Sequence, residues 1–64
     1  MTLEEAIHQL NKGSKIRHRL FSPYEFIYKK DGKLYDELEI ELSEKEFWQY
    51  RNTPPFEKDW AIIE

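Results

Sequence analysis

The sequence predicts a small α+β domain in which an N-terminal helix packs on a mainly antiparallel sheet of about four strands, with a short second helix before the last strand. Two observations carry this prediction. Apolar residues recur with helical spacing at the start of the chain and alternate with polar residues afterwards. An Asp-Gly pair also joins two of the alternating segments, as in a tight β-hairpin. With 64 residues, the chain is expected to form one domain, residues 1–64.

The first helix is expected to begin after Thr2. Thr2 and Glu5 have the spacing of a capping box, in which each side chain bonds the backbone amide of the other residue. Gly13 is suited to end the helix, because glycine adopts the left-handed conformation without steric cost. Four positions between them form one apolar stripe: Leu3, Ala6, Ile7 and Leu10.

Residues 15–20 alternate strictly and are predicted to form a half-buried strand. Ile16, His18 and Leu20 share one side of it. Pro23 then interrupts the strand pattern, because proline donates no backbone hydrogen bond. The opposite side carries a row of cations, which consists of Lys15, Arg17 and Arg19.

A two-residue loop at Asp31-Gly32 predicts a hairpin between residues 24–30 and 33–35, because such loops need positive φ at both positions. This register places Tyr28 opposite Tyr35. It also divides the hairpin into an aromatic face and an aliphatic face. The aromatic face is expected to hold Tyr24, Phe26, Tyr28 and Tyr35, and the aliphatic face Ile27 and Leu34.

Residues 36–42 continue the alternation and are predicted to form a strand whose Leu38 and Ile40 extend the aliphatic face. Ser43 and Glu46 repeat the capping-box spacing, so a short helix should follow and end near Arg51. The last strand is expected at residues 59–63, apolar on both sides and therefore covered on both faces.

Ten aromatic residues are more than one core of this size needs. One helix can cover one face of the sheet, so the other face should form a second buried surface, either a subunit interface or a ligand pocket. We therefore predict a homo-oligomer, with two-fold symmetry as the commonest arrangement. The residues assigned to a protein interface are Phe26, Tyr28, Tyr35 and Trp48.

No catalytic, cofactor or metal-binding pattern is recognisable in the chain. Cysteine is absent, and the two histidines, His8 and His18, lack the spacing of a metal site. His8 is expected to be a solvated helix residue. Both glycines are explained by turns, which leaves none for a phosphate-binding loop. We therefore expect a protein that binds rather than an enzyme.

The length of the apolar segments limits the possible cellular location of the protein, and the net charge limits its possible binding partners. No apolar run approaches the roughly 20 residues of a membrane span, and no secretion signal is recognisable, so a cytoplasmic protein is expected. The net charge of −3 argues against a direct nucleic-acid binder, which would be basic overall.

Two charged features allow either a functional or a structural interpretation. The cation row at residues 15–19 could hold phosphates, or it could pair across strands with Glu37, Glu39 and Glu41. The acids of residues 36–46 could imitate a nucleic-acid backbone and occupy a basic host enzyme. They could equally be a solvated strand and helix surface.

Two stretches of the chain, LEEAIHQLNKGSKIRHR at residues 3–19 and DWAIIE at residues 59–64, resemble small phage proteins of the second Thoeris anti-defence family. The IYKKDGKLYD hairpin resembles them more loosely. The family follows its basic strand with a tryptophan and glycines, whereas this chain has Leu20 to Pro23 there. The resemblance implies a phage counter-defence protein that forms oligomers. Arg17, Arg19 and Trp60 lie in the matching stretches.

The function that this resemblance implies is sequestration of a nucleotide-derived immune signal of the cyclic ADP-ribose type, without catalysis, in the host cytoplasm. Such a pocket needs aromatic rings for the base and arginines for the phosphates. The alternative is a protein inhibitor that binds a host defence or nucleic-acid enzyme through the acids of residues 36–46 and the nearby Phe47 and Trp48. The residues assigned to ligand binding are Arg17, Arg19, Phe21, Tyr24 and Trp60.

Overall fold

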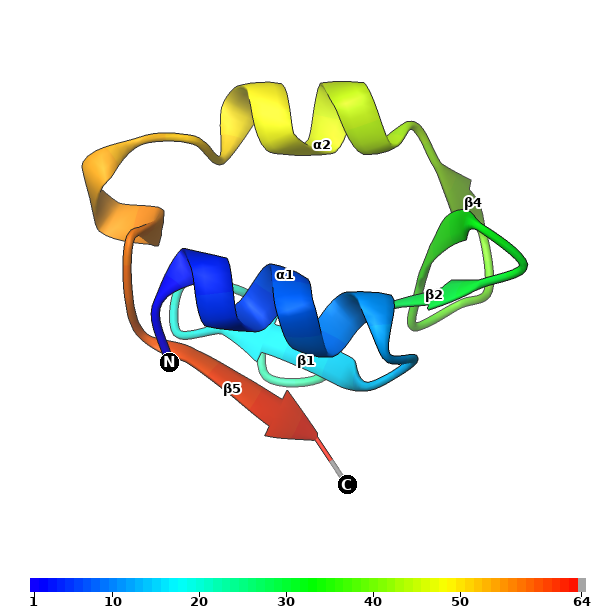
Figure 1. Ribbon diagram of the computed structural model, residues 1–64, viewed down its shortest axis with the longest axis horizontal. Helices are drawn as coiled ribbons and strands as arrows, with labels where there is room; N and C mark the ends of the chain where they lie inside the picture. The colour runs from blue at the N-terminus through cyan, green and yellow to red at the C-terminus, as the bar shows by residue number, and fades with distance from the viewer. Residues whose placement is uncertain (64) are drawn as a thin grey trace.

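The computed structural model describes residues 1–63 and has the predicted α+β architecture. The N-terminal helix, the antiparallel sheet and the second helix before the last strand are confirmed (Figure 1). The elements are α1 (Leu3–Asn11), β1 (Lys15–His18), β2 (Ile27–Lys30), β3 (Lys33–Asp36), β4 (Glu41–Leu42), α2 (Glu44–Tyr50), the 3-10 turn η1 (Pro54–Phe56) and β5 (Trp60–Ile63).

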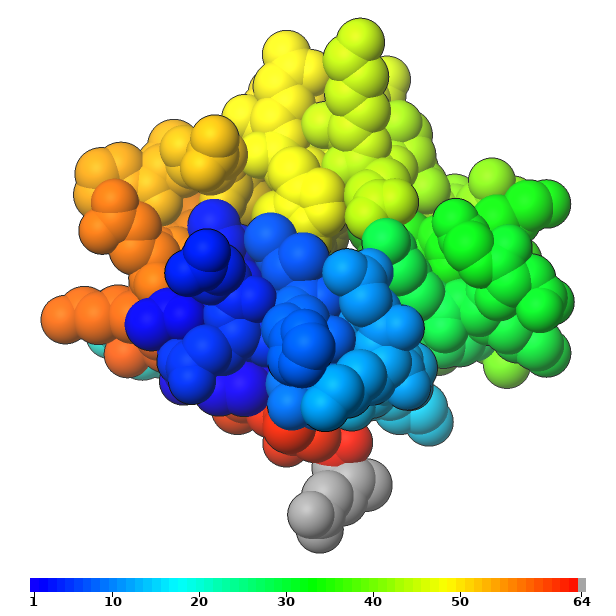
Figure 2. Space-filling view, in the orientation of Figure 1, coloured from blue at the N-terminus to red at the C-terminus, as the bar shows by residue number. Residues whose placement is uncertain are grey.

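The sheet has five antiparallel strands in the order β4-β3-β2-β1-β5. Both helices pack on one face of it, which we call the inner face. In the space-filling view, the atoms of α1 lie in front of β1, and those of α2 lie above α1 (Figure 2). The core between the helices and the sheet consists of Ala6, Leu10, Ile16, Phe21, Ile27, Leu34, Phe47 and Trp60.

The predicted capping box holds the start of α1. The Thr2 hydroxyl accepts from the Glu5 amide at 3.2 Å, and the Glu5 carboxylate accepts from the Thr2 amide at 2.9 Å. The hydrogen bond that the Thr2 backbone amide donates to the Glu5 carboxylate lowers the pKa of that carboxyl, and the Thr2 side chain lowers it further. After the helix, Gly13 has a φ of 92° and its amide donates to the Leu10 carbonyl, so the predicted left-handed end is also confirmed.

Lys29 connects both helices to the sheet on the inner face. Its ammonium donates to the Asn11 side chain at 2.9 Å and forms an ion pair with Glu44 at 2.6 Å. Asn11 ends α1 and Glu44 begins α2. A cation on an otherwise apolar face is therefore explained by its two partners.

The predicted strands 15–20 and 24–30 are too long, because β1 ends at His18 and β2 begins at Ile27. The chain turns after His18, where the Phe21 amide donates to the His18 carbonyl. This turn sends Phe21 into the core and leaves Leu20 exposed. Tyr24 is 87% exposed in the same loop, so its expected place on the aromatic face of the hairpin is wrong.

The predicted strand 36–42 is also wrong, because the chain reverses within it. The Asp36 carboxylate accepts from the amides of Leu38 (2.9 Å) and Ile40 (3.0 Å), and Glu39 takes a φ of 63°. The two residues that follow form β4, which pairs antiparallel with β3. Leu38 and Ile40 consequently lie on an exposed loop and not on the aliphatic face.

The last strand, β5, pairs with β1 and lies at an edge of the sheet. Trp60 is buried, but Ala61 and Ile62 are exposed, so the expected cover on both faces is wrong. The Met1 ammonium donates to the Trp60 carbonyl at 2.9 Å, and the Trp60 amide donates to the Met1 carbonyl at 3.2 Å. The start of β5 is therefore bonded on both edges.

Candidate functional site on the outer face of the sheet

The second face of the sheet, which we call the outer face, has no helix packed on it within the described residues. Residues that are partners in an antiparallel register point to the same face, so the four strand pairings identify its members. Phe26, just before β2, joins them because its ring lies beside Tyr28. The outer face consists of Lys15, Arg17, Phe26, Tyr28, Lys30, Lys33, Tyr35, Glu41, Ala61 and Ile63.

Three aromatic rings lie side by side at the centre of the outer face. Tyr28 and Tyr35 are register partners, as predicted, and their rings are stacked with centroids 5.7 Å apart and planes 25° apart. The Phe26 ring follows at 6.3 Å from that of Tyr28. All three are half-buried, so they offer an apolar surface that remains accessible.

Cations flank these rings. The Lys15 ammonium lies 5.2 Å from the centroid of the Phe26 ring, a cation–π arrangement. Arg17 donates to the Pro23 carbonyl at 3.2 Å. Lys30 and Lys33 are register partners beside the hairpin turn. Like charges in such a position repel each other, and a bound anion would relieve that repulsion.

Two of the three rings, those of Phe26 and Tyr28, line a hollow of about 440 Å³ on the outer face. The exposed loop between β3 and β4 contributes one side of it, and the first two strands contribute the other. Its volume is in the range of small-ligand sites, which is roughly 300–1,000 Å³. The lining residues are Lys15, Phe26, Tyr28, Lys30, Glu37, Leu38 and Glu39.

The Tyr28 phenol remains protonated at neutral pH. Burial raises its pKa above the usual value of 10, and the negative charges of Glu39, Tyr35 and Asp36 raise it further. Glu39 and Tyr28 both line the hollow. A neutral phenol can donate a hydrogen bond as well as stack, which suits the recognition of a polar aromatic ligand.

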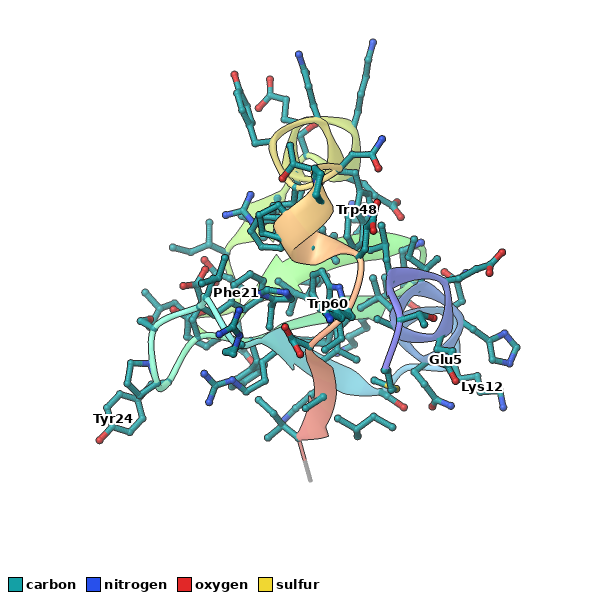
Figure 3. All side chains as sticks on the ribbon, turned by 90° about the vertical axis from the view of Figure 1, so that its left-hand side faces the viewer. Glu5, Lys12, Phe21, Tyr24, Trp48 and Trp60 are labelled. Atoms are coloured by element: carbon teal, nitrogen blue, oxygen red, sulfur yellow. The ribbon has the colours of Figure 1, made fainter. Side chains whose placement is uncertain are left out.

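The residues predicted to bind ligand do not form one site. Phe21 and Trp60 lie in the core with their rings edge to face, 5.7 Å apart, and Tyr24 points away from the body of the protein (Figure 3). Arg19 lies beyond the end of β1 and forms an exposed ion pair with Asp59 at 3.4 Å. Arg17 alone among the five lies on the outer face.

The residues predicted to form a protein interface divide into two groups. Phe26, Tyr28 and Tyr35 lie together on the outer face. Trp48 lies on the helical side, half-buried, with its ring 4.9 Å from that of Phe47 and 5.8 Å from that of Trp60. That a second copy of the chain covers the outer face stays a prediction.

The cation row does not pair with the predicted glutamates. Within residues 1–63, the ion pairs are Arg19–Asp59, Lys29–Glu44 and Lys33–Glu41. Neither Lys15 nor Arg17 takes part in them. The acidic residues of 36–46 also differ in their interactions. The Asp36 carboxylate bonds the loop that follows β3, whereas Glu41 and Glu44 form ion pairs with lysines.

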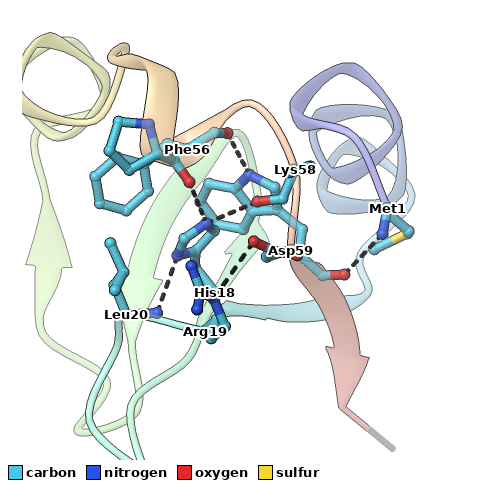
Figure 4. Close-up of polar contacts among 9 residues, drawn as sticks. Met1, His18, Arg19, Leu20, Phe56, Lys58 and Asp59 are labelled. Carbon is cyan, nitrogen blue, oxygen red and sulfur yellow. Dashed lines mark hydrogen bonds and ion pairs between the residues drawn. The ribbon is translucent and has the colours of Figure 1, made fainter.

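His18 is a structural residue on the inner face (Figure 4). Its Nδ1 accepts from the Leu20 amide at 3.0 Å, so the proton of the neutral ring lies on Nε2. Nε2 faces the carbonyls of Pro55 (3.0 Å) and Lys58 (2.8 Å). His8 is exposed on α1, as predicted. Among the described residues, no group of three or more histidines or acids is placed to hold a metal ion.

Sequence reasoning missed four residues of the hollow: Lys30, Glu37, Leu38 and Glu39. The opposition of Lys30 and Lys33 followed from the Asp31-Gly32 loop and could have indicated an anion site. The place of the two glutamates depends on the turn at Asp36, for which the alternating sequence gives no signal.

Comparison of the chain with protein-family models, curated proteins and solved structures finds no match. No helix in residues 1–63 is long and apolar enough to cross a membrane.

Proposed function

We propose that the protein binds a small nucleotide-like ligand on its outer face and holds it without transforming it. The observation that carries this proposal is the stacked pair of Tyr28 and Tyr35 beside the opposed lysines Lys30 and Lys33. Bases stack on exposed aromatic rings, and lysines bind phosphates. The hollow therefore combines the two chemistries that a nucleotide requires.

Sequestration of a nucleotide-derived immune signal by a phage counter-defence protein is the biological role that we propose for this binding. The resemblance at residues 3–19 and 59–64 supports that role. Of the three residues assigned to ligand binding in those stretches, Arg17, Arg19 and Trp60, Arg17 lies on the outer face. Tight binding without turnover agrees with the chain's lack of a recognisable catalytic pattern. The aromatic residues of the proposed site are Phe26, Tyr28 and Tyr35 in place of Phe21, Tyr24 and Trp60.

Isothermal titration calorimetry with cyclic ADP-ribose isomers, cyclic oligonucleotides and adenosine 5′-monophosphate tests this proposal. We expect Tyr28→Leu to weaken binding about tenfold or more, because stacking of one base on one aromatic ring contributes about 1–3 kcal/mol. Tyr50→Leu is the matched control, since Tyr50 is exposed on α2, away from the outer face. Lys30→Gln should weaken binding and reduce its dependence on salt.

Two results would contradict the proposal. The first is the absence of heat with every nucleotide at high micromolar protein concentration. The second is equal weakening by Tyr28→Leu and Tyr50→Leu, which would place the ligand elsewhere. A folded circular dichroism spectrum of each variant is the control for both.

A direct inhibitor of a host enzyme is the second candidate, and an acidic hollow of about 280 Å³ is the observation that favours it. Ile27, Leu42 and Phe47 contribute its apolar part. The guanidinium of Arg51 lies 4.2 Å from the centroid of the Phe47 ring and forms no ion pair among the described residues. The carboxylates around the hollow are Glu25, Asp36, Glu37 and Glu46.

Capture of a host enzyme from bacterial lysate tests this second candidate. An electrostatically steered partner should be retained at low salt, released as salt rises, and lost with Glu46→Lys. Glu4→Lys on α1 is the control, because it makes the same charge change outside the hollow. Retention that is insensitive to salt and to Glu46→Lys would argue against this function.

A further inference from the structure

The hollow on the outer face has opposite charges at its two ends. Along the β2–β3 hairpin, Lys30 and Lys33 lie next to the turn, Tyr28 and Tyr35 lie two residues further on, and the register then reaches Asp36 and the loop that follows it. Two residues of a strand span roughly 6.6–7 Å. A ligand stacked on Tyr28 in this hollow therefore has Lys30 at one end. At the other end it has the carboxylates of Glu37 and Glu39, with the Lys15 ammonium beside Phe26.

Glu37, which lines the hollow, has a buried acceptor that lacks a donor. Oε2 of Glu37 is buried and is the one buried side-chain nitrogen or oxygen in residues 1–63 with no hydrogen-bond partner. Buried polar groups are normally satisfied, and an ionised carboxylate can only accept. Glu39 lines the same hollow as Tyr28. Neither glutamate forms an ion pair within the described residues.

We infer that Glu37 and Glu39 select a nucleoside monophosphate whose base carries an exocyclic amino group, with the phosphate bound at Lys30. The inference rests on the proposed function, since it assumes that the base stacks on Tyr28 and Tyr35. The amino group donates to a carboxylate, as a cytosine amino group donates to glutamate in protein–DNA complexes. A base with a keto oxygen in place of the exocyclic amino group presents an acceptor there, and the carboxylate repels that acceptor.

Calorimetry with adenosine 5′-monophosphate and inosine 5′-monophosphate tests this inference, because the two nucleotides differ at that position of the base. The wild type should bind the adenosine nucleotide about tenfold more tightly, since a site built to accept from an amino group rejects the analogue without one. Glu37→Gln and Glu39→Gln should each reduce the preference, because an amide can donate to the keto oxygen. Glu4→Gln on α1, outside both hollows, should leave it unchanged.

The possible results separate the inference from the proposed function. Equal affinity for the two monophosphates, a preference for inosine, or no effect of either glutamate substitution overturns the inference and leaves the binding function standing. Binding of a cyclic nucleotide without binding of either monophosphate does the same. Absence of binding to every nucleotide overturns both.

Discussion

Replacement of His18 by alanine is expected to lower the free energy of unfolding by about 3–5 kcal/mol, comparable to the whole stability of so small a core. The His18 ring is fully buried and lies 4.5 Å from the Phe56 ring and 4.9 Å from the Trp60 ring, between centroids. Alanine would leave a cavity there. It would also remove the partners of two carbonyls and of the Leu20 amide, at about 1–3 kcal/mol for each buried group left unsatisfied.

Urea denaturation followed by circular dichroism measures this effect. His18→Phe separates its two parts, because phenylalanine keeps an aromatic ring in the core but cannot make the hydrogen bonds. His8→Ala is the matched control, since an exposed residue should change stability by less than about 0.5 kcal/mol. Equal denaturation midpoints for His18→Ala and the wild type would contradict the structural role.

Replacement of Trp60 by alanine is expected to have a similar effect, about 3–5 kcal/mol. Trp60 is 3% exposed, and its indole Nε1 donates to the Phe56 carbonyl at 2.7 Å. Its ring contacts those of His18, Phe21, Trp48 and Phe56. The residue therefore joins the last strand to the loop after β1, to α2 and to η1.

Thermal denaturation compares Trp60→Ala with Trp48→Ala, which removes the same side chain from a half-buried position. The loss of melting temperature should be clearly larger at Trp60. Because Trp60 and His18 are in contact, the double alanine variant should lose less stability than the two single losses added together. A loss at Trp60 no greater than that at Trp48 would show that Trp60 is not the centre of the aromatic core.

The features predicted correctly from the sequence are local. Thr2 and Glu5 bond each other within one turn, and Gly13 ends the helix through bonds to the preceding residues. The loop at Asp31-Gly32 fixes the register of the hairpin on both sides of it. Each of these depends on residues a few positions apart, so spacing alone is enough to predict it.

The errors arise where a single side chain overrides an alternating pattern. Residues 36–42 alternate as a strand would, but the carboxylate of Asp36 bonds two amides further on and reverses the chain. After β1, Phe21 occupies the core position that alternation assigned to Leu20. The first outcome depends on local hydrogen bonds of one side chain and the second on tertiary packing, and the pattern of polar and apolar residues contains neither.

Part of the candidate site could be predicted from the sequence because it depends on local structure. Tyr28 and Tyr35 follow from the hairpin register, which is local. Trp60, which the sequence assigns to ligand binding, does not lie near these tyrosines. The pairing of β5 with β1 places Trp60 opposite His18 and therefore on the inner face. That pairing joins residues more than 40 positions apart, and no nearby turn specifies it.

The position of β1 between β2 and β5 determines when the protein can fold during its synthesis. One edge of β1 stays without a partner until residues 60–63 have been made, and the two carbonyls that bond His18 come from Pro55 and Lys58. Contacts between such distant residues form after a long loop has closed, which slows folding. On the ribosome, α1 and the β2–β3 hairpin can form early, whereas the core has to wait until the last strand emerges.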